Sequence, residues 1–151
     1  MNRFFCVLAA LIVTCGAGCQ SAPDFSNVLE REWKLIDVRV NNKSINFDRS
    51  ELSAQGFGDI FTLTFGSDRL SGVGAPNRYF APYTPGENQS ISVGNIAGTL
   101  MASFMEPEKL KEHEYFMYLQ NANKWDLVKN NLELSSKGED GRDVVLVFSE
   151  P

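Results

Sequence analysis

The cysteines are the residues whose position most clearly predicts chemistry, because all three lie within the first 19 residues. Arg3 gives the start a positive charge, residues 4–13 form an apolar run, and small residues follow up to Cys19. A charged start, a short apolar segment and small residues at the cleavage point are typical of a secretory signal peptide. The run is shorter than the roughly 20 residues of a membrane-spanning helix. We therefore predict a signal peptide over residues 1–18, cleaved between Gly18 and Cys19.

The segment Ala17-Gly18-Cys19 resembles the last three positions of the lipobox of bacterial lipoproteins. Gly16 departs from that pattern, in which an apolar residue is usual, and Cys15 fits less well because a threonine precedes it. The resemblance implies a diacylglyceryl thioether on Cys19 and an acyl chain such as palmitate on its freed amine. Several acyl chains anchor a protein stably where one is marginal. An ordinary secretory signal with coincidental cysteines is the alternative.

The position after the predicted lipid-bearing cysteine is occupied by Gln20. An aspartate there usually retains Gram-negative lipoproteins in the inner membrane. The resemblance therefore implies a lipid-anchored protein of the cell envelope, in the outer membrane and facing the periplasm if the source is Gram-negative. Residues 19–29 are mostly small or polar and are predicted to form a tether. One domain is expected over residues 30–151.

The composition excludes several classes of function. The chain has 151 residues, of which 43% are hydrophobic and 22% charged, so a globular domain is expected. The net charge is -5 without a basic cluster, which argues against nucleic-acid binding. The only histidine, His113, lies between two glutamates on the predicted solvent side of a helix. We predict no catalytic residue, no metal and no cofactor.

Alternating apolar residues predict strands at 33–40, 60–65, 69–74, 77–83 and 89–94, with a loop at 41–58. Glu106-Pro107-Glu108 predicts the start of a helix that runs to residue 123 and places Tyr115, Phe116, Leu119 and Ala122 on one face. Strands at 125–128, 132–134 and 144–148 close the chain. Short connections favour antiparallel pairing. We predict an α+β fold: a curled antiparallel sheet or partly open barrel of about eight short strands, with one amphipathic helix inserted before the last three.

Five segments in this order resemble the META domain (HslJ-like) family of small bacterial envelope proteins, over roughly residues 30–149. They are Trp33-x-Leu35, Phe65-x-x-x-Arg69-Leu70-x-Gly72-x-Gly74-Ala75-Pro76-Asn77-Arg78-Tyr79, Thr99-Leu100-Met101-Ala102-Ser103, Glu112-x-x-Tyr115-Phe116-x-x-Leu119 and Leu132-x-Leu134. Many members carry two cysteines where this chain has Ala75 or Pro76, and Ser103. The resemblance implies that a crosslink is missing here and that packing must supply the corresponding stability.

The glycines of Gly72-Val73-Gly74 lack the rest of a phosphate-binding loop and are interpreted as strand-end glycines. Tyr79, Phe80 and Tyr83 are interpreted as core or strand-pair residues, and the alternative is a surface for an apolar ligand or partner strand. We expect a non-catalytic envelope domain that binds a partner protein or an apolar ligand in a pocket framed by helix and sheet. One alternative is a hydrolase that uses paired carboxylates on an envelope polysaccharide. Another is a structural domain without a specific partner, with a role in envelope stress tolerance.

Overall fold

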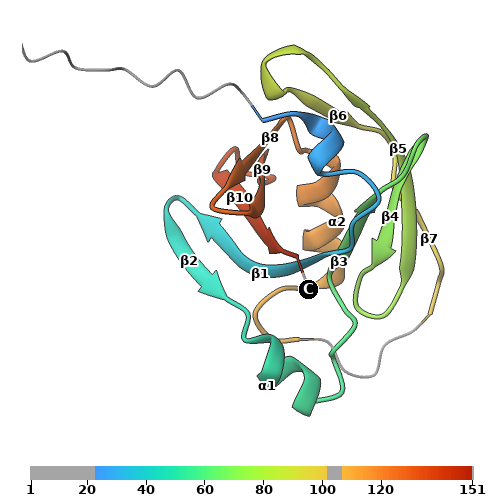
Figure 1. Ribbon diagram of the computed structural model, residues 1–151. Coiled ribbons are helices and arrows are strands. Elements are labelled where there is room, and N and C mark those ends of the chain that lie inside the picture. Colours follow the sequence, from blue (N-terminus) through green and yellow to red (C-terminus); the bar gives the residue numbers. More distant parts are fainter. Residues whose placement is uncertain (1–22, 102–106, 151) are drawn as a thin grey trace, which may run out of the picture.

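The computed structural model describes residues 23–101 and 107–150 (Figure 1). The elements of the first half are η1 (Phe25–Asn27), β1 (Trp33–Val40), β2 (Lys43–Asn46), α1 (Arg49–Ala54), β3 (Thr62–Phe65), β4 (Arg69–Val73) and β5 (Arg78–Pro85). Those of the second half are η2 (Glu87–Gln89), β6 (Ile91–Val93), β7 (Ala97–Gly98), α2 (Glu112–Gln120), β8 (Lys124–Val128), β9 (Asn131–Lys137) and β10 (Asp143–Ser149). Within these residues, no helix is long and apolar enough to cross a membrane.

The strands form one antiparallel sheet in the order β6-β5-β4-β3-β1-β10-β9-β8. Ser90 and Lys124 form a bridge between the two ends of this order. Beside it, the N–H of Ile91 donates to the carbonyl of Asn123 at 3.1 Å. These contacts curl the sheet into a nearly closed barrel of eight strands, with β2 added beside β1 and β7 beside β5. The predicted α+β fold with a curled antiparallel sheet is confirmed.

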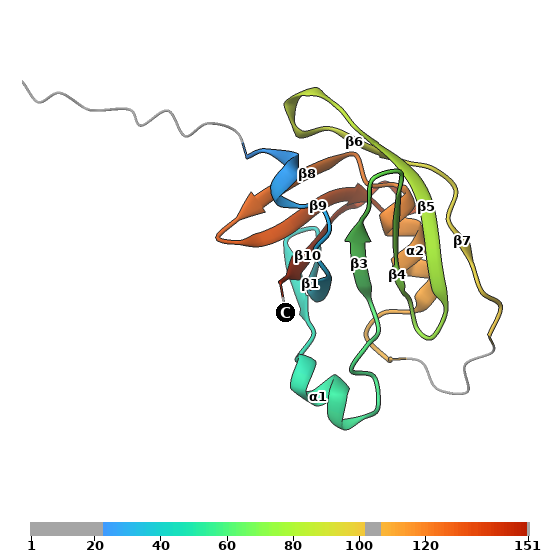
Figure 2. The same cartoon turned by 45° about the vertical axis from the view of Figure 1, so that its right-hand side comes forward.

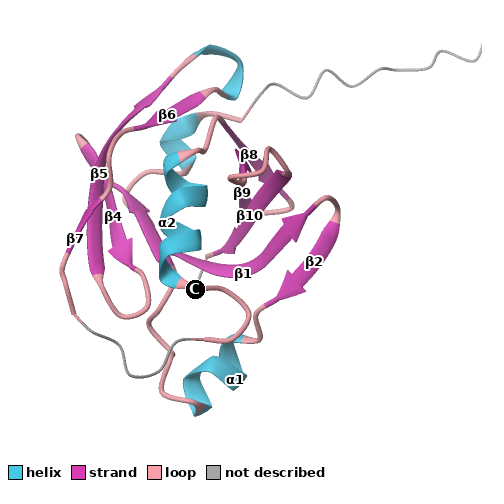
Figure 3. Cartoon of the chain, turned by 180° about the vertical axis from the view of Figure 1, so that it is seen from behind, coloured by secondary structure: helices cyan, strands magenta, loops and turns pink. Residues whose placement is uncertain are grey.

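Figure 3 shows the helix α2 between β4 and β5 on one side and β8–β10 on the other, and Figure 2 shows it beside β4 and β5. Tyr115 and Leu119 of α2 are completely buried there. Burying one such side chain contributes about 1.5–3 kcal/mol. The large side chains that fill the barrel are Trp33, Tyr115, Phe61, Phe65, Phe148, Leu35, Leu63, Leu70, Leu119, Leu132, Leu134 and Leu146.

The helix α2 begins at Glu112, so the predicted start at Glu106-Pro107-Glu108 is wrong. Pro107 and Leu110 are buried in an irregular segment before the helix. The Glu114 carboxylate accepts the N–H of Lys111 at 2.9 Å, which satisfies a donor at the true start. The capping contact therefore sets the start of the helix, and the proline packs against the domain instead.

The predicted loop over residues 41–58 is also wrong, because it contains β2 and α1. Asn41 and Asn42 have φ values of 48° and 65°, which suit the tight turn of a hairpin. The Asp48 carboxylate accepts the N–H groups of Ser50 and Glu51 at 2.8 and 3.3 Å and caps α1. The turn and the cap are both local signals that place a hairpin and a short helix in this segment.

The first described residues pack on the barrel. Val28 is fully buried, and the Trp33 indole N–H donates to its carbonyl at 3.0 Å. Phe25 of η1 makes an edge contact with Phe65, with ring centroids 5.4 Å apart. The structured part of the chain thus includes residues of the predicted tether at 19–29. Figure 1 places η1 at one end of the barrel and α1 at the other.

Candidate functional site

The residues predicted from sequence to carry function lie in different places. Gly18 and Cys19, the predicted cleavage and lipidation residues, lie outside the described residues. Tyr79, Phe80 and Tyr83 lie on β5. Tyr79 is 2% exposed, whereas Phe80 is 48% exposed, because neighbouring side chains of a strand point to opposite faces. The three aromatic residues therefore do not form one surface.

Tyr79 belongs to a buried pair with Tyr115. Their hydroxyl oxygens are 3.0 Å apart, and both hydroxyls lie within hydrogen-bond distance of the Thr62 carbonyl, at 2.7 and 3.1 Å. Burial raises the pKa of Tyr79 well above the ordinary tyrosine value, and it raises the pKa of Tyr115 too. The pair is neutral and joins β5, α2 and β3 inside the barrel.

Phe80 and Tyr83 have separate surroundings. The Arg69 guanidinium lies 5.7 Å from the centre of the Phe80 ring, a cation–π contact on the outer side of β5. The Tyr83 hydroxyl donates to the Gly66 carbonyl at 2.6 Å, and its ring packs against Phe65 with centroids 4.9 Å apart. Tyr83 thus packs at the η1 end of the core, away from the exposed ring of Phe80.

Gly72 and Gly74 allow close packing between elements. A Cβ atom on Gly72 would overlap the carbonyl oxygen of Thr62 on β3. A Cβ atom on Gly74 would lie 2.5 Å from a carboxylate oxygen of Glu112 and 2.8 Å from the ring of Phe116. Only glycine permits such close approaches. The packing of β3 and α2 against β4 therefore explains both glycines.

Glu112 at the start of α2 holds the segment between β4 and β5. Its Oε1 accepts the N–H groups of Ala75 and Asn77 at 2.6 and 2.7 Å. Its Oε2 accepts the side-chain amide of Asn77 at 2.6 Å. Three hydrogen bonds to one charged acceptor make a strong local contact. Glu112 is one of the two glutamates beside His113, which was expected on the solvent side of the helix, so this role of Glu112 was not predicted from the sequence.

Asn77 extends this network to the segment after β7. Its Oδ1 accepts the Thr99 hydroxyl at 2.8 Å and the Met101 N–H at 2.7 Å, and its amide donates to the Met101 carbonyl at 3.3 Å. Asn77 is 7% exposed, whereas its partners Thr99 and Met101 are exposed, so these hydrogen bonds are partly buried. Asn77 thus links residues 75–77 to residues 99–101 by hydrogen bonds. Ser103, one of the positions at which the family resemblance implies a missing crosslink, lies outside the described residues.

A cavity of about 290 Å³ opens between α1 and residues 107–109, and we call it the α1 groove. Its lining combines apolar and charged side chains. The apolar residues Phe47 and Leu52 are 5% and 8% exposed, so they form a floor with little open surface. The lining residues are Phe47, Asp48, Glu51, Leu52, Gln55, Phe57, Pro107, Glu108 and Lys109.

Arg49 fixes the wall of the α1 groove against the barrel. Its guanidinium donates to the carbonyl of Gly58 at 2.7 Å and twice to that of Ile60 at 3.1 Å. Burial lowers the pKa of this guanidinium from its ordinary value, since desolvation disfavours the charged form. The Lys109 ammonium donates to the Asn46 carbonyl at 3.1 Å and ties the opposite wall to β2. Both walls of the groove are thus attached to the fold.

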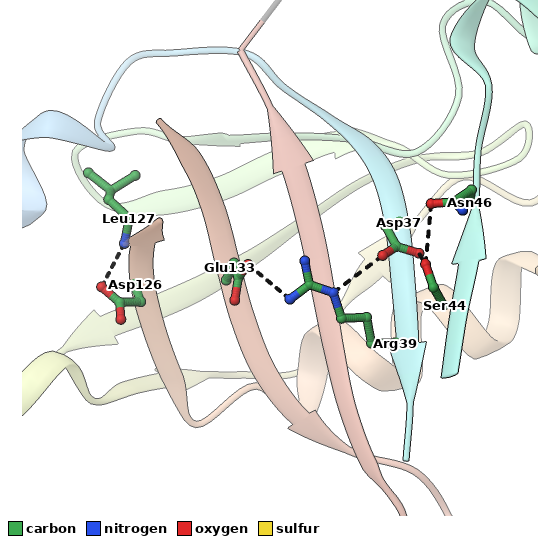
Figure 4. A network of polar contacts seen from close by, with 7 residues as sticks. All are labelled: Asp37, Arg39, Ser44, Asn46, Asp126, Leu127 and Glu133. Atoms are coloured by element: carbon green, nitrogen blue, oxygen red, sulfur yellow. Dashed lines mark hydrogen bonds and ion pairs between the residues drawn. The ribbon is translucent and has the colours of Figure 1, made fainter. Parts of the chain in front are cut away.

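A second polar network joins β1, β2 and β9 (Figure 4). Arg39 donates to Asp37 at 3.3 Å and to Glu133 at 3.0 Å, and the Ser44 hydroxyl donates to Asp37 at 2.7 Å. A glycoside hydrolase needs two carboxyl groups that reach the substrate from one cleft. Here one guanidinium engages both carboxylates, which suits a structural ion-pair network. Among the described residues, no group of three or more His, Cys, Asp or Glu side chains could hold a metal ion.

The sequence matches the model of the META domain family over residues 26–150. The fold is similar to the NMR structure of a protein from Burkholderia xenovorans, with a TM-score of 0.61 and 19% identity, covering 93% of this chain and 99% of that one. It is also similar to the crystal structure of a DUF4847 family protein from Bacteroides vulgatus ATCC 8482, with a TM-score of 0.59 and 13% identity, covering 84% and 96%. No curated protein matches. Because the family model spans most of the sequence, the chain belongs to the META domain family.

Proposed function

We propose that this protein is a lipid-anchored domain of the bacterial envelope that binds a partner protein in the α1 groove and catalyses no reaction. The observation that carries the proposal is the position of the groove. It lies at the α1 end of the barrel, while the first described residues and η1 lie at the other end (Figure 1). An anchor before η1 leaves the groove facing away from the membrane and open to a partner.

The predicted anchor would hold the domain close to the bilayer. An extended chain spans at most about 3.5 Å per residue, so residues 19–23 reach roughly 18 Å. Because η1 packs on Phe65, the link cannot lengthen without breaking this contact. We infer that the η1 end stays near the membrane and that the α1 groove projects from it by the length of the barrel.

The packing of the barrel favours a protein partner over an apolar ligand held between helix and sheet. That space is occupied by completely buried side chains, including Phe61, Tyr115 and Leu119. The α1 groove, in contrast, is open, and charged residues contribute to its lining. Small apolar ligands prefer enclosed and mainly apolar pockets. The groove suits part of a protein surface better.

Site-specific photocrosslinking in cells tests the proposal. A photoreactive benzoylphenylalanine replaces Gln55 in the groove, and in a matched control it replaces Ser67, an exposed residue in the turn after β3. We expect a discrete crosslinked protein from position 55 and none from position 67. Equal crosslinking at both positions, or none at either, would contradict the proposal and favour a structural domain without a specific partner.

A further inference from the structure

We propose that the α1 groove recognises an extended protein segment in which a lysine or arginine lies next to an apolar residue. This inference rests on the proposed function and adds the chemistry of the partner. The apolar floor is formed by Phe47, Leu52 and Phe57, and the carboxylates of Asp48, Glu51 and Glu108 also line the cavity. A floor of this kind accepts an apolar side chain, and the carboxylates attract a cationic one beside it.

The charge of the α1 groove is negative. Three carboxylates and one ammonium, that of Lys109, line it. The ammonium of Lys109 is directed to the Asn46 carbonyl at 3.1 Å. Charges at an exposed cavity act over about 8 Å at physiological salt. A cationic segment is therefore attracted to the groove, and an acidic segment is repelled.

The carboxylates retain capacity for such a segment. Asp48 receives the two N–H groups of α1 through Oδ1, and Glu51 receives the Gln55 amide through Oε1 at 3.3 Å. An ionised carboxylate offers roughly four acceptor positions on its two oxygens. The contacts within α1 hold these side chains in place and leave room for a guanidinium or ammonium group.

The volume and the negative charge of the groove favour a short protein segment over other cationic or apolar partners. Its volume of about 290 Å³ holds a few side chains and no folded domain. A polyamine would bring only thin methylene chains to the floor of Phe47, Leu52 and Phe57 and no branched or aromatic side chain. An anionic lipid surface attracts basic residues, so it would repel a groove of this sign.

Binding of defined peptides to the full processed protein, purified from membranes in detergent, tests the inference. The probe is a capped fluorescent peptide of alternating leucine and arginine, and fluorescence anisotropy gives its Kd. The comparison peptides replace arginine by glutamate or leucine by glycine. We expect saturable binding of the leucine–arginine peptide, at least tenfold weaker binding of both others, and weaker binding at high salt.

Variants locate the binding on the protein. Glu51→Gln with Glu108→Gln should weaken binding of the leucine–arginine peptide at least fivefold, because both glutamate side chains are exposed and line the groove. The matched control, Glu87→Gln with Glu139→Gln, removes the same charge from exposed positions elsewhere and should leave the Kd unchanged. Circular dichroism and thermal unfolding confirm that both variants fold.

The outcomes separate this inference from the proposed function. Three results would overturn the proposal that the α1 groove recognises a cationic segment. They are equal binding of the arginine and glutamate peptides, no saturable binding, and an unchanged Kd in the Glu51→Gln/Glu108→Gln variant. A crosslink at position 55 together with any of these results would leave the proposed function standing and remove the inference alone. Absence of the crosslink at position 55 would remove both.

Discussion

Glu112 accepts hydrogen bonds from both the backbone N–H and the side-chain amide of Asn77, at 2.7 and 2.6 Å. These bonds join the first turn of α2 to the segment between β4 and β5. The Asn77 side chain in turn accepts a hydrogen bond from the Met101 N–H and donates one to the Met101 carbonyl. Three segments that are distant in sequence therefore depend on one carboxylate and one amide.

Removing the carboxylate should destabilise the domain. Glu112→Ala leaves the N–H groups of Ala75 and Asn77 without their acceptor, and an unmet buried or half-buried donor costs about 1–3 kcal/mol. We expect a loss of that size in the free energy of unfolding, measured by urea titration. His113→Ala changes the exposed neighbour and should cost no more than about 0.5 kcal/mol. Equal losses in the two variants would show that the network contributes nothing specific.

Gly72 should not tolerate a side chain. In Gly72→Ala the new Cβ overlaps the backbone oxygen of Thr62, which cannot move without shifting β3. Overpacking of this kind costs about 1–3 kcal/mol and sometimes more. The matched control is Gly138→Ala, since its Cβ would lie 3.3 Å from a side-chain oxygen of Asp140 and no backbone must move. Thermal unfolding should show a large loss for position 72 and a small one for position 138. The reverse order would contradict the packing of β3 on β4.

The buried tyrosine pair predicts a loss of stability in alkaline solution. The pKa values of Tyr79 and Tyr115 are raised above the ordinary 10.0 in the folded state, mainly by burial. The folded state therefore keeps these protons more tightly than the unfolded state. The contribution of the two raised pKa values to the free energy of unfolding is complete below about pH 10. It is lost as the pH rises above that value toward the folded-state pKa. The free energy of unfolding should fall steadily above pH 10.

Removing both hydroxyls tests this assignment. The Tyr79→Phe/Tyr115→Phe variant is less stable at neutral pH, because the Thr62 carbonyl loses both donors. Its stability should nevertheless fall less steeply above pH 10 than that of the unaltered protein. Some slope remains, since the pKa values of Tyr83 and Tyr118 are raised too. An identical alkaline slope in both proteins would exclude the pair as its source.

Much of the barrel was predictable because its strands follow simple alternation. The alternation over residues 60–65 predicted a strand, and its alternate residues Phe61, Leu63 and Phe65 are all completely buried. The observed strand is nevertheless shorter than the predicted 60–65, because Phe61 adopts a φ of 51° and β3 begins at Thr62. A positive φ at a bulky residue is sustained by its tertiary surroundings, here Phe47 and Tyr115, and local propensity does not indicate it.

The α1 groove and the Glu112 network were not predictable from local pattern. The groove combines residues 47–57 with residues 107–109, and no periodicity relates segments so far apart. Glu112 lies in a run of polar and charged residues that is typical of a solvated helix face. Only the fold brings Asn77 to it. The Asp48 cap with Glu51 three residues later was a usable signal for α1. Tyr79 and Phe80 show the converse case, in which alternation along β5 alone separates a core residue from an exposed one.

The proposed lipid anchor on Cys19 is tested most directly by the intact mass of the protein purified from the membranes of its own host. We expect a chain that begins at Cys19 and carries the added mass of a diacylglyceryl group and an amide-linked acyl chain. We also expect Cys19→Ala to abolish both the added mass and the cleavage after Gly18. A chain that retains residues 1–18, or one that begins elsewhere with no lipid mass, would contradict a lipid anchor on Cys19.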